Sequence, residues 1–337
     1  MTPLLEARNV SKIYGGGFLH RQQTTALAMA SVTIEDETPT IIAIAGESGS
    51  GKTTLARLLL GMTPPTSGQI LYKGQNLQQL DSQQQRIFRR EVQAVFQDPF
   101  EVYNPFYKVD HALTTPISKF FPKASAAETQ HMIEEALQAV GLRPEETLGR
   151  YPHQLSGGQR QRVMVARALL LQPRIIVADE PVSMVDASLR ATILESLLRA
   201  HKAYNISIIY ITHDLTTAYQ LSERILMMYQ GNVVEAGDVN LVIKEPQHPY
   251  TQLLIDSIPL PNPKVHWGQR EIQPRQSNNH TAQHGCTFAD RCPQVMARCR
   301  TQTPPLYQTN SQRVVACYLY EDAPVQSEIP AQRASVL

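Results

Sequence analysis

The stretch Gly46-Glu-Ser-Gly-Ser-Gly-Lys-Thr53 follows an apolar run at residues 41–45 and precedes a helix-like run at residues 53–60. It matches the pattern G-x-x-x-x-G-K-[ST] in the strand-to-helix context that is typical of a phosphate-binding P-loop. Glycines let backbone N–H groups wrap a β-phosphate, and the helix N-terminus adds partial positive charge. In this pattern the lysine reaches the β- and γ-phosphate oxygens, and the threonine hydroxyl faces Mg²⁺. The sequence therefore predicts a nucleotide site whose candidate contacts are Gly46, Ser48, Gly49, Gly51, Lys52, Thr53 and Thr54.

A second motif supplies carboxylates. The apolar run at residues 175–178 ends in Asp179 and Glu180, which is a Walker B arrangement. We expect Asp179 to hold Mg²⁺ through water and Glu180 to polarise the attacking water as general base. The plain alternative is an exposed acidic turn after a core strand, and the presence of a P-loop disfavours it. The two motifs together predict an NTPase.

The overall composition narrows the class of protein. The chain has 337 residues, of which 42 % are hydrophobic and 18 % charged, and its net charge is +1. These values fit a globular protein with a full core and not a disordered or fibrous one. The near-zero charge argues against a general nucleic-acid or membrane-surface binder. No run approaches the about 18 apolar residues of a spanning helix, and the N-terminus lacks the apolar region of a signal peptide, so we expect a cytosolic chain.

Patterning along the chain indicates two parts. Strand-like runs dominate the first hundred residues, a helical signal follows from about residue 98, and strands alternate with a helix between residues 175 and 211. This alternation predicts a parallel α/β sheet with a helical insertion. Prolines accumulate after residue 246, which indicates a boundary and a loop-rich second module.

The run Leu155-Ser-Gly-Gly-Gln159, within a longer match from Tyr151 to Arg162, resembles the signature of ATP-binding-cassette (ABC) ATPases. It stands before a helix-like segment, so its serine and glycine amides would form an anion site at a helix N-terminus. The resemblance implies that these residues grip the γ-phosphate of an ATP held by the P-loop of another subunit. A dimer of cassettes is therefore implied, with Ser156, Gly157, Gly158 and Gln159 as contacts in trans.

Four further residues resemble family elements in the expected order. Gln97 resembles the Q-loop glutamine that contacts Mg²⁺ and relays to a membrane partner, and Asp186 resembles the D-loop aspartate of the dimer interface. His213 resembles the switch histidine that contacts the γ-phosphate, and Tyr14 resembles the aromatic residue that stacks on adenine. A lone histidine after a strand or a lone tyrosine is more often structural, and the ordered set reverses those odds.

The resemblance covers about residues 4–245 and implies ATP and Mg²⁺ as ligands. It makes Glu180, His213 and Lys52 the catalytic set, with Thr53, Gln97 and Asp179 around Mg²⁺. Two departures are Met184-Val185, where the family usually has a small residue and leucine, and a lengthened segment at residues 15–23. Neither removes a catalytic group.

The fold class implied is a P-loop NTPase with a RecA-like core, an antiparallel β subdomain and a helical signature subdomain, followed by a small loop-rich C-terminal module. The predicted domains are a cassette at residues 1–245, with its helical subdomain at about 98–165, and an extension at residues 246–337. Only 109 positions separate Gly46 from Leu155, which leaves no room for the coiled coils of DNA-repair relatives. The single P-loop also disfavours the two-cassette translation factors. A soluble ABC ATPase acting on nucleic acid is therefore the weaker reading.

The C-terminal sequence points to one branch of the family. The runs His248-Pro-Tyr-Thr-Gln-Leu-Leu254 and Gly285-Cys-Thr-Phe-Ala-Asp-Arg-Cys-Pro293 resemble the extension of oligopeptide and dipeptide importer ATPases. The implied partners are a second ABC ATPase subunit, identical or a paralogue, two transmembrane permease subunits and an extracytoplasmic solute-binding protein, with no nucleic acid. The implied location is the cytoplasmic face of the membrane, with residues 100–109 docking a permease helix. Nickel and oligosaccharides are alternative solutes in this group.

The four cysteines all lie near the end of the chain, at Cys286, Cys292, Cys299 and Cys317. Their spacing is not the C-x2-C of common zinc modules, and Pro293 follows Cys292 as prolines do beside iron–sulfur ligands. A four-cysteine [4Fe–4S] cluster is the favoured prediction, which the resemblance supports for some members of the group. Zinc, unmetallated thiols and disulfides stay open as alternatives, and His280 and His284 are possible substitute ligands.

Overall fold

The structure, a computed structural model, describes residues 2–15, 23–98, 103–183, 185–258 and 285–326. Its centre is a nine-stranded sheet in the order β13-β11-β12-β10-β9-β3-β8-β7-β6. Strands β3, β6, β7, β8 and β9 are parallel, and β10 to β13 continue the sheet antiparallel. The strands are β3 (Ile41–Ala45), β6 (Val92–Val95), β7 (Ile175–Asp179), β8 (Ser207–Thr212), β9 (Arg224–Tyr229), β10 (Asn232–Asp238), β11 (Leu306–Asn310), β12 (Arg313–Val315) and β13 (Val325–Gln326).

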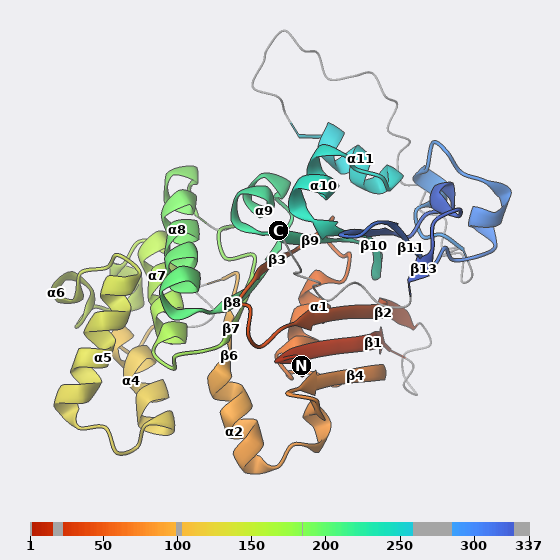
Figure 1. Ribbon diagram of the computed structural model, residues 1–337. Coiled ribbons are helices and arrows are strands. Elements are labelled where there is room, and N and C mark those ends of the chain that lie inside the picture. The colour runs from red at the N-terminus through yellow and green to blue at the C-terminus, as the bar shows by residue number, and fades with distance from the viewer. Residues whose placement is uncertain (1, 16–22, 99–102, 184, 259–284, 327–337) are drawn as a thin grey trace, which may run out of the picture.

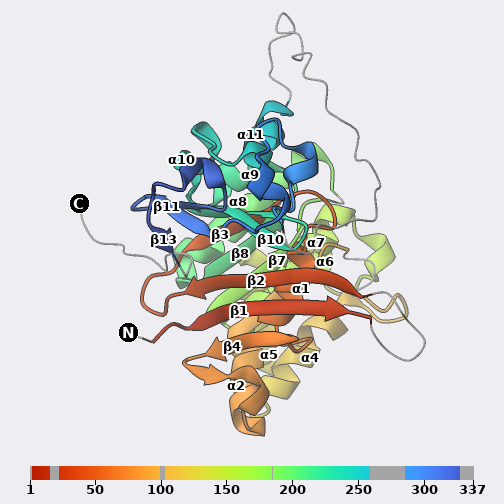
Figure 2. The same ribbon diagram turned by 90° about the vertical axis from the view of Figure 1, so that its right-hand side faces the viewer.

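One face of the central sheet carries the P-loop helix and a second sheet. Helix α1 (Lys52–Leu59) packs here with an antiparallel sheet in the order β2-β1-β4-β5, which crosses the front of Figure 2. Ile42 and Ile44 of β3 point into this core because successive side chains of a strand face opposite sides. The second sheet consists of β1 (Leu5–Tyr14), β2 (Thr24–Ile34), β4 (Ser67–Tyr72) and β5 (Gln75–Asn76).

The other face carries most of the helices. Ala43 and Ala45 of β3 join a core that includes the buried side of α7 (Gly157–Leu169) and of the helices around it. The neighbouring helices are α4 (Val109–Phe120), α5 (Ala126–Ala139), α6 (Pro144–Thr147), α8 (Ala187–Tyr204), α9 (Leu215–Leu221), α10 (Val239–Lys244) and α11 (Pro249–Asp256). Helix α2 (Ser82–Glu91) lies outside this group, and only Phe88 of it is buried, in the core shared with α1.

Local sequence explains the ends of these elements. Ser125 and Glu128 form a reciprocal capping box at the start of α5, and Asp81 and Gln84 do the same for α2. Gly141, two positions beyond the last residue of α5, has φ 69 and takes the left-handed conformation that ends helices. The predicted parallel sheet with a helical insertion is confirmed, with α4 to α6 forming a helical arm at the opposite end of the molecule from the C-terminal strands (Figure 1).

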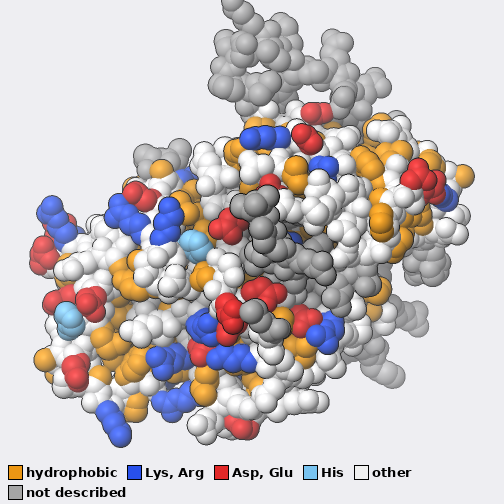
Figure 3. All heavy atoms as spheres, viewed as in Figure 1, with side chains coloured by type: hydrophobic (Ala, Val, Ile, Leu, Met, Phe, Trp, Pro, Cys, Tyr) orange, Lys and Arg blue, Asp and Glu red, His pale blue; other side chains and the backbone are white. Residues whose placement is uncertain are grey.

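The C-terminal part of the chain adds strands to the central sheet. Strand β12 pairs with β10 in the register Glu235↔Val315, so chain beyond residue 300 adds strands to the sheet that begins with the P-loop strand. Short 3₁₀ turns precede β11, at Ala289–Arg291 and Ala297–Arg300, and another lies between β12 and β13, at Tyr318–Tyr320. The division at residue 245 remains a prediction. None of the described helices is long and apolar enough to cross a membrane. Figure 3 shows the surface in the view of Figure 1, on which acidic and basic side chains are interleaved.

Candidate nucleotide site

The P-loop lies between the end of β3 and the start of α1, as its sequence predicts. Gly51 precedes α1 with φ 100, and a Cβ there would meet the carbonyl oxygen of Ala26 at 2.4 Å. Gly49 is also left-handed, with φ 78, but a Cβ there would meet nothing within 4 Å. Glycine is therefore required at position 51 because β2 approaches closely there, whereas Gly49 borders open space beside the loop.

Lys52 is held beneath the loop and is only 5 % exposed. Its ammonium donates to the carbonyl oxygens of Gly46 at 2.8 Å and Glu47 at 2.9 Å. Burial lowers the pKa of Lys52, and the nearby carboxylates of Glu180, Asp179 and Glu47 oppose that shift. The Lys52 side chain is therefore oriented by backbone carbonyl groups of the P-loop.

The predicted magnesium ligands of the two motifs lie side by side. The Thr53 hydroxyl, in the first turn of α1, donates to the Asp179 carboxylate at the end of β7, with 3.4 Å between the oxygens. Burial raises the pKa of Asp179, the hydroxyl contact opposing it. A hydroxyl and a carboxylate beside open space form a donor set suited to Mg²⁺, so these residues fit the predicted ion.

Glu180 and His213 meet one strand further along the sheet. Glu180 has φ 46, a conformation that non-glycine residues rarely adopt, and its N–H donates to Ile211 at the end of β8. Its carboxylate lies 3.1 Å from Nδ1 of His213, which follows β8. The C-terminal ends of β7 and β8 thus bring the predicted base and the predicted switch histidine into contact.

The signature residues begin α7 as predicted. The Ser156 hydroxyl accepts the backbone N–H of Gln159, and the side-chain amide oxygen Oε1 of Gln159 accepts the backbone N–H of Ser156 in return. A Cβ on Gly157 would meet nothing within 4 Å, whereas one on Gly158 would meet Leu189 of α8 at 2.7 Å. Because α7 and α1 pack on opposite faces of the central sheet, the structure does not bring the signature and the P-loop of one chain together (Figure 1).

The other predicted contacts are dispersed around this centre. Gln97 is exposed just after β6, and Asp186 is exposed at the start of α8. Tyr14 ends β1 and is 39 % exposed, with the Lys12 ammonium 5.3 Å from its ring centroid. Ser48 is exposed and Thr54 half-buried on α1. Met184 and residues 16–22 lie outside the described residues.

Two residues that touch the P-loop were not found by sequence reasoning. The Tyr250 hydroxyl of α11 accepts the N–H of Glu47 at 2.8 Å, and Arg291 forms a two-pronged ion pair with the Glu47 carboxylate, both contacts at 3.0 Å. Glu47 and Arg291 are 244 positions apart, and no pattern in one sequence links them. The sequence offers one hint, which is that Glu47 lies within the P-loop motif and Arg291 within the run Gly285–Pro293.

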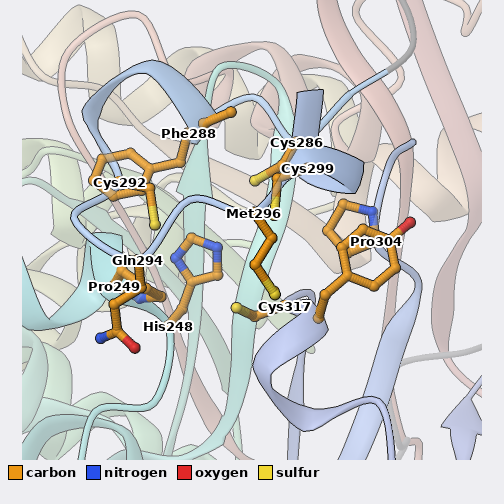
Figure 4. A pocket seen from close by; sticks show the side chains of 12 residues that line it. His248, Pro249, Cys286, Phe288, Cys292, Gln294, Met296, Cys299, Pro304 and Cys317 are labelled. Atoms are coloured by element: carbon orange, nitrogen blue, oxygen red, sulfur yellow. The ribbon is translucent and has the colours of Figure 1, made fainter. Parts of the chain in front are cut away.

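The four cysteines line one pocket together with His248 and Met296. Figure 4 shows their side chains arranged around the same space. All four are free thiols, and burial raises the pKa of Cys286, Cys292 and Cys317, the last to about 11. Among the described residues no three His, Cys, Asp or Glu side chains form a group that could hold a metal ion, so this arrangement does not support the predicted cluster. His280 and His284 lie outside the described residues.

Comparison with known proteins places the chain. An ABC transporter family model matches residues 29–183, and a model of the oligopeptide/dipeptide transporter C-terminal region matches residues 234–299. The putative oligopeptide transport ATP-binding protein YkfD of Bacillus subtilis is 36 % identical, with 97 % of this chain and 98 % of that protein covered. This chain belongs to the ABC transporter family. The dipeptide transport ATP-binding protein DppF of Haemophilus influenzae is also 36 % identical, over 94 % of this chain and 97 % of its own.

Solved structures of cassettes agree with this assignment. A dimeric cassette in a post-hydrolysis state with ADP and Pi is 28 % identical and has a TM-score of 0.61. The alignment covers 70 % of this chain and 98 % of that cassette. The protein cbiO1 of Clostridium perfringens, part of an ABC transporter complex, is 26 % identical with a TM-score of 0.63, over 73 % of this chain and 92 % of its own. The chain is therefore an ABC-type ATPase.

Proposed function

We propose that this ABC ATPase is a subunit of a multi-subunit importer and that its ATP hydrolysis powers the uptake of di- and oligopeptides. The observation that carries the proposal is the meeting of Lys52, the Thr53–Asp179 pair and the Glu180–His213 pair at one edge of the central sheet. The peptide assignment is supported by relatives whose names describe oligopeptide or dipeptide transport and which align over nearly the whole chain.

ATP would be held by the P-loop, with the amides of residues 48–53 and Lys52 around its phosphates and Tyr14 beside the adenine. Thr53 and Asp179, with Gln97, would hold Mg²⁺, which when bound neutralises phosphate charge. The polarity of the loop suits this role, because α1 points its N-terminal N–H groups toward the loop. Each of these groups is contributed by this chain.

Glu180 would accept a proton from the attacking water, and His213 would orient that water and contact the γ-phosphate. The contact of 3.1 Å between the two side chains supports this pairing, since a general base needs a partner that fixes its direction. The left-handed backbone of Glu180 supports it too, because strain of this kind persists where surrounding structure holds a functional side chain in place.

Completion of the site requires a second cassette. The signature residues begin α7 on the face of the sheet away from α1, so they are available to an ATP on another subunit. We infer that two cassettes close on two ATP molecules, with Ser156, Gly157, Gly158 and Gln159 reaching across and Asp186 at the interface. Reopening after hydrolysis would then drive the membrane subunits.

A permease subunit would dock beside the Q-loop. Phe106 is 86 % exposed and Tyr107 is 52 % exposed, both between Gln97 and α4. Adjacent exposed aromatic side chains are characteristic of protein contacts. Residues 99–102 of the predicted docking segment lie outside the described residues. Location at the cytoplasmic side of the membrane would follow from this docking.

The test is to express the chain with its neighbouring permease and binding-protein genes and to purify the complex into lipid vesicles. We expect ATPase activity to rise when the binding protein carries a peptide, and labelled peptide to accumulate in the lumen in an ATP-dependent way. If nickel or an oligosaccharide stimulates the ATPase and peptide does not, the assignment of the solute is wrong and the importer function stands. Stimulation by nucleic acid, with none by the permeases, would contradict the proposal.

For the cysteine pocket we propose a [4Fe–4S] cluster on one ground, that all four cysteines line the same pocket. The side chains of the described residues are not grouped as metal ligands, so only measurement of bound iron can establish the cluster. No step of hydrolysis depends on it. Iron and sulfide analysis of anaerobically purified protein, with absorbance near 400 nm, tests it. Colourless, iron-free protein would overturn the cluster, and stoichiometric zinc would replace it.

A further inference from the structure

The C-terminal segment, by which we mean the described residues after 245, makes two direct contacts with the P-loop, through Tyr250 and Arg291. The two terminal guanidinium nitrogens of Arg291, Nη1 and Nη2, each donate to one of the two Glu47 carboxylate oxygens at 3.0 Å. The Arg291 side chain is only 17 % exposed, whereas Glu47 is 36 % exposed. A planar, two-pronged pair restricts both position and orientation, and partial burial reduces the screening of its charges by solvent.

The second contact fixes the backbone of the same residue. The Tyr250 hydroxyl accepts the N–H of Glu47 at 2.8 Å, and the Tyr250 side chain is fully buried. Its ring packs against Tyr229 and Phe288, with centroids 4.6 and 5.6 Å away. Arg291 lies over this same cluster, 5.7 Å from the Tyr229 ring and 5.6 Å from the Phe288 ring. Glu47 is therefore held by the Arg291 guanidinium and the Tyr250 hydroxyl, and both of these side chains pack on the same aromatic cluster.

Glu47 in turn orients the lysine. The Glu47 carbonyl oxygen accepts a hydrogen bond from the Lys52 ammonium at 2.9 Å. A rotation of the peptide around residue 47 would therefore move both the amides that follow it and the hydrogen bond that directs Lys52. Binding of a charged ligand to a preorganised site avoids the cost of ordering that site.

We propose that Arg291 and Tyr250 are positioning residues of the nucleotide site, which hold the P-loop in its ATP-binding conformation through Glu47. The C-terminal segment then contributes to the ATP site by positioning the P-loop. This inference rests on the nucleotide site proposed above. It assigns no contact between these two residues and ATP.

The test measures the affinity of the full-length chain for Mg²⁺-ATP by calorimetric titration, with the thermal midpoint recorded for each variant. Arg291→Met and Glu47→Gln each break the fork, and we expect each to weaken ATP binding about tenfold or more, which corresponds to about 1.4 kcal/mol. Tyr250→Phe removes only the hydroxyl and should weaken binding as well. Arg291→Lys keeps one charge and should fall between wild type and Arg291→Met.

Arg300→Met is the matched control. Arg300 pairs with Asp290 at 3.1 Å in the same segment, both side chains are more than half exposed, and neither is described in contact with the P-loop. We expect this variant to bind ATP as wild type does. An equal loss of affinity in Arg300→Met and Arg291→Met, or a loss in Arg291→Met that follows a lowered thermal midpoint, would overturn the inference.

The double variant Glu47→Gln/Arg291→Met separates positioning from simple neutralisation of a charge near the phosphates. Positioning predicts that the double variant is no weaker than either single variant, because all three lack the same fork. If Arg291 merely neutralises Glu47, then Glu47→Gln should bind ATP more tightly than wild type and the double variant should recover, which would overturn the inference. Lys52→Met serves as the reference: if it binds ATP normally, the nucleotide site itself is wrong. If it loses binding while Arg291→Met does not, only the positioning role is wrong.

Discussion

Glu180→Gln removes the predicted general base while changing almost nothing else. The substitution keeps the size of the side chain and an oxygen that can face His213 at the present distance of 3.1 Å. It also leaves the left-handed backbone at residue 180 as it is, so no new backbone strain arises. We therefore expect the free energy of unfolding to change by less than about 0.5 kcal/mol.

Turnover should respond very differently. General-base catalysis contributes roughly 10²- to 10⁴-fold, so phosphate release should fall by about that factor, or about 3 to 5 kcal/mol of transition-state stabilisation. ATP affinity should be retained because Lys52 and the loop are untouched. The matched control is Glu195→Gln, at an exposed glutamate of α8 that pairs with Arg199 on the helix surface, and it should turn over normally.

The assay is phosphate release by the assembled complex at saturating Mg²⁺-ATP, with nucleotide binding measured in parallel. Release within threefold of wild type by Glu180→Gln would refute the assignment of the base. Equal losses in Glu180→Gln and Glu195→Gln would refute the reasoning as well, because they would mean that the assay reports general disturbance of the cassette.

Further predictions address the loop, the buried carboxyl and the docking surface. Gly51→Ala should lower the unfolding free energy by more than the roughly 1–2 kcal/mol of left-handed strain, because its Cβ would also meet Ala26 at 2.4 Å, whereas Gly49→Ala should cost only the strain; urea unfolding measures both. Burial raises the pKa of Glu235 from 4.5 to about 7, so the folded protein favours the protonated carboxyl. The free energy of unfolding contributed by this group is therefore fully present below pH 4.5 and is lost as the pH rises through 7. Urea unfolding should accordingly show Glu235→Gln gaining up to about 3 kcal/mol on wild type between pH 4.5 and 7.5, and a constant difference would contradict the shift. Phe106→Ala should leave thermal stability unchanged and weaken co-purification of the permeases, and undiminished co-purification would remove this side chain from the docking surface.

Much of the nucleotide site could be predicted because its signals are local. A five-residue apolar strand, a glycine-rich loop and a helix follow one another directly between Ile41 and Leu59, and β3 has the predicted bounds Ile41–Ala45. The same holds for Asp179 and Glu180 at the end of β7, and for Ser156 at the start of α7. In each case the backbone geometry that places the residue is set by its immediate neighbours.

Other features depend on contacts that one sequence does not encode locally. Strand β12 has three residues and exists because the exposed edge of β10 accepts it, so its sequence carries little pattern of its own. Helix α2 is polar apart from Ile87 and Phe88 and buries only Phe88, so its sequence offers few apolar residues from which a buried face could be predicted. The Arg291–Glu47 fork joins residues that the sheet topology brings together, and periodicity cannot predict such a pair.

We propose above that the signature of another cassette completes the ATP site. The most direct test of this proposal is sedimentation of full-length Glu180→Gln, alone and with an equimolar partner cassette, with and without Mg²⁺-ATP. We predict that ATP converts the chains into a dimer of cassettes and that adding Ser156→Arg, which places a long side chain at the start of α7, abolishes that dimer. Sedimentation that is the same with and without ATP, or a dimer that persists with Ser156→Arg, would contradict the account.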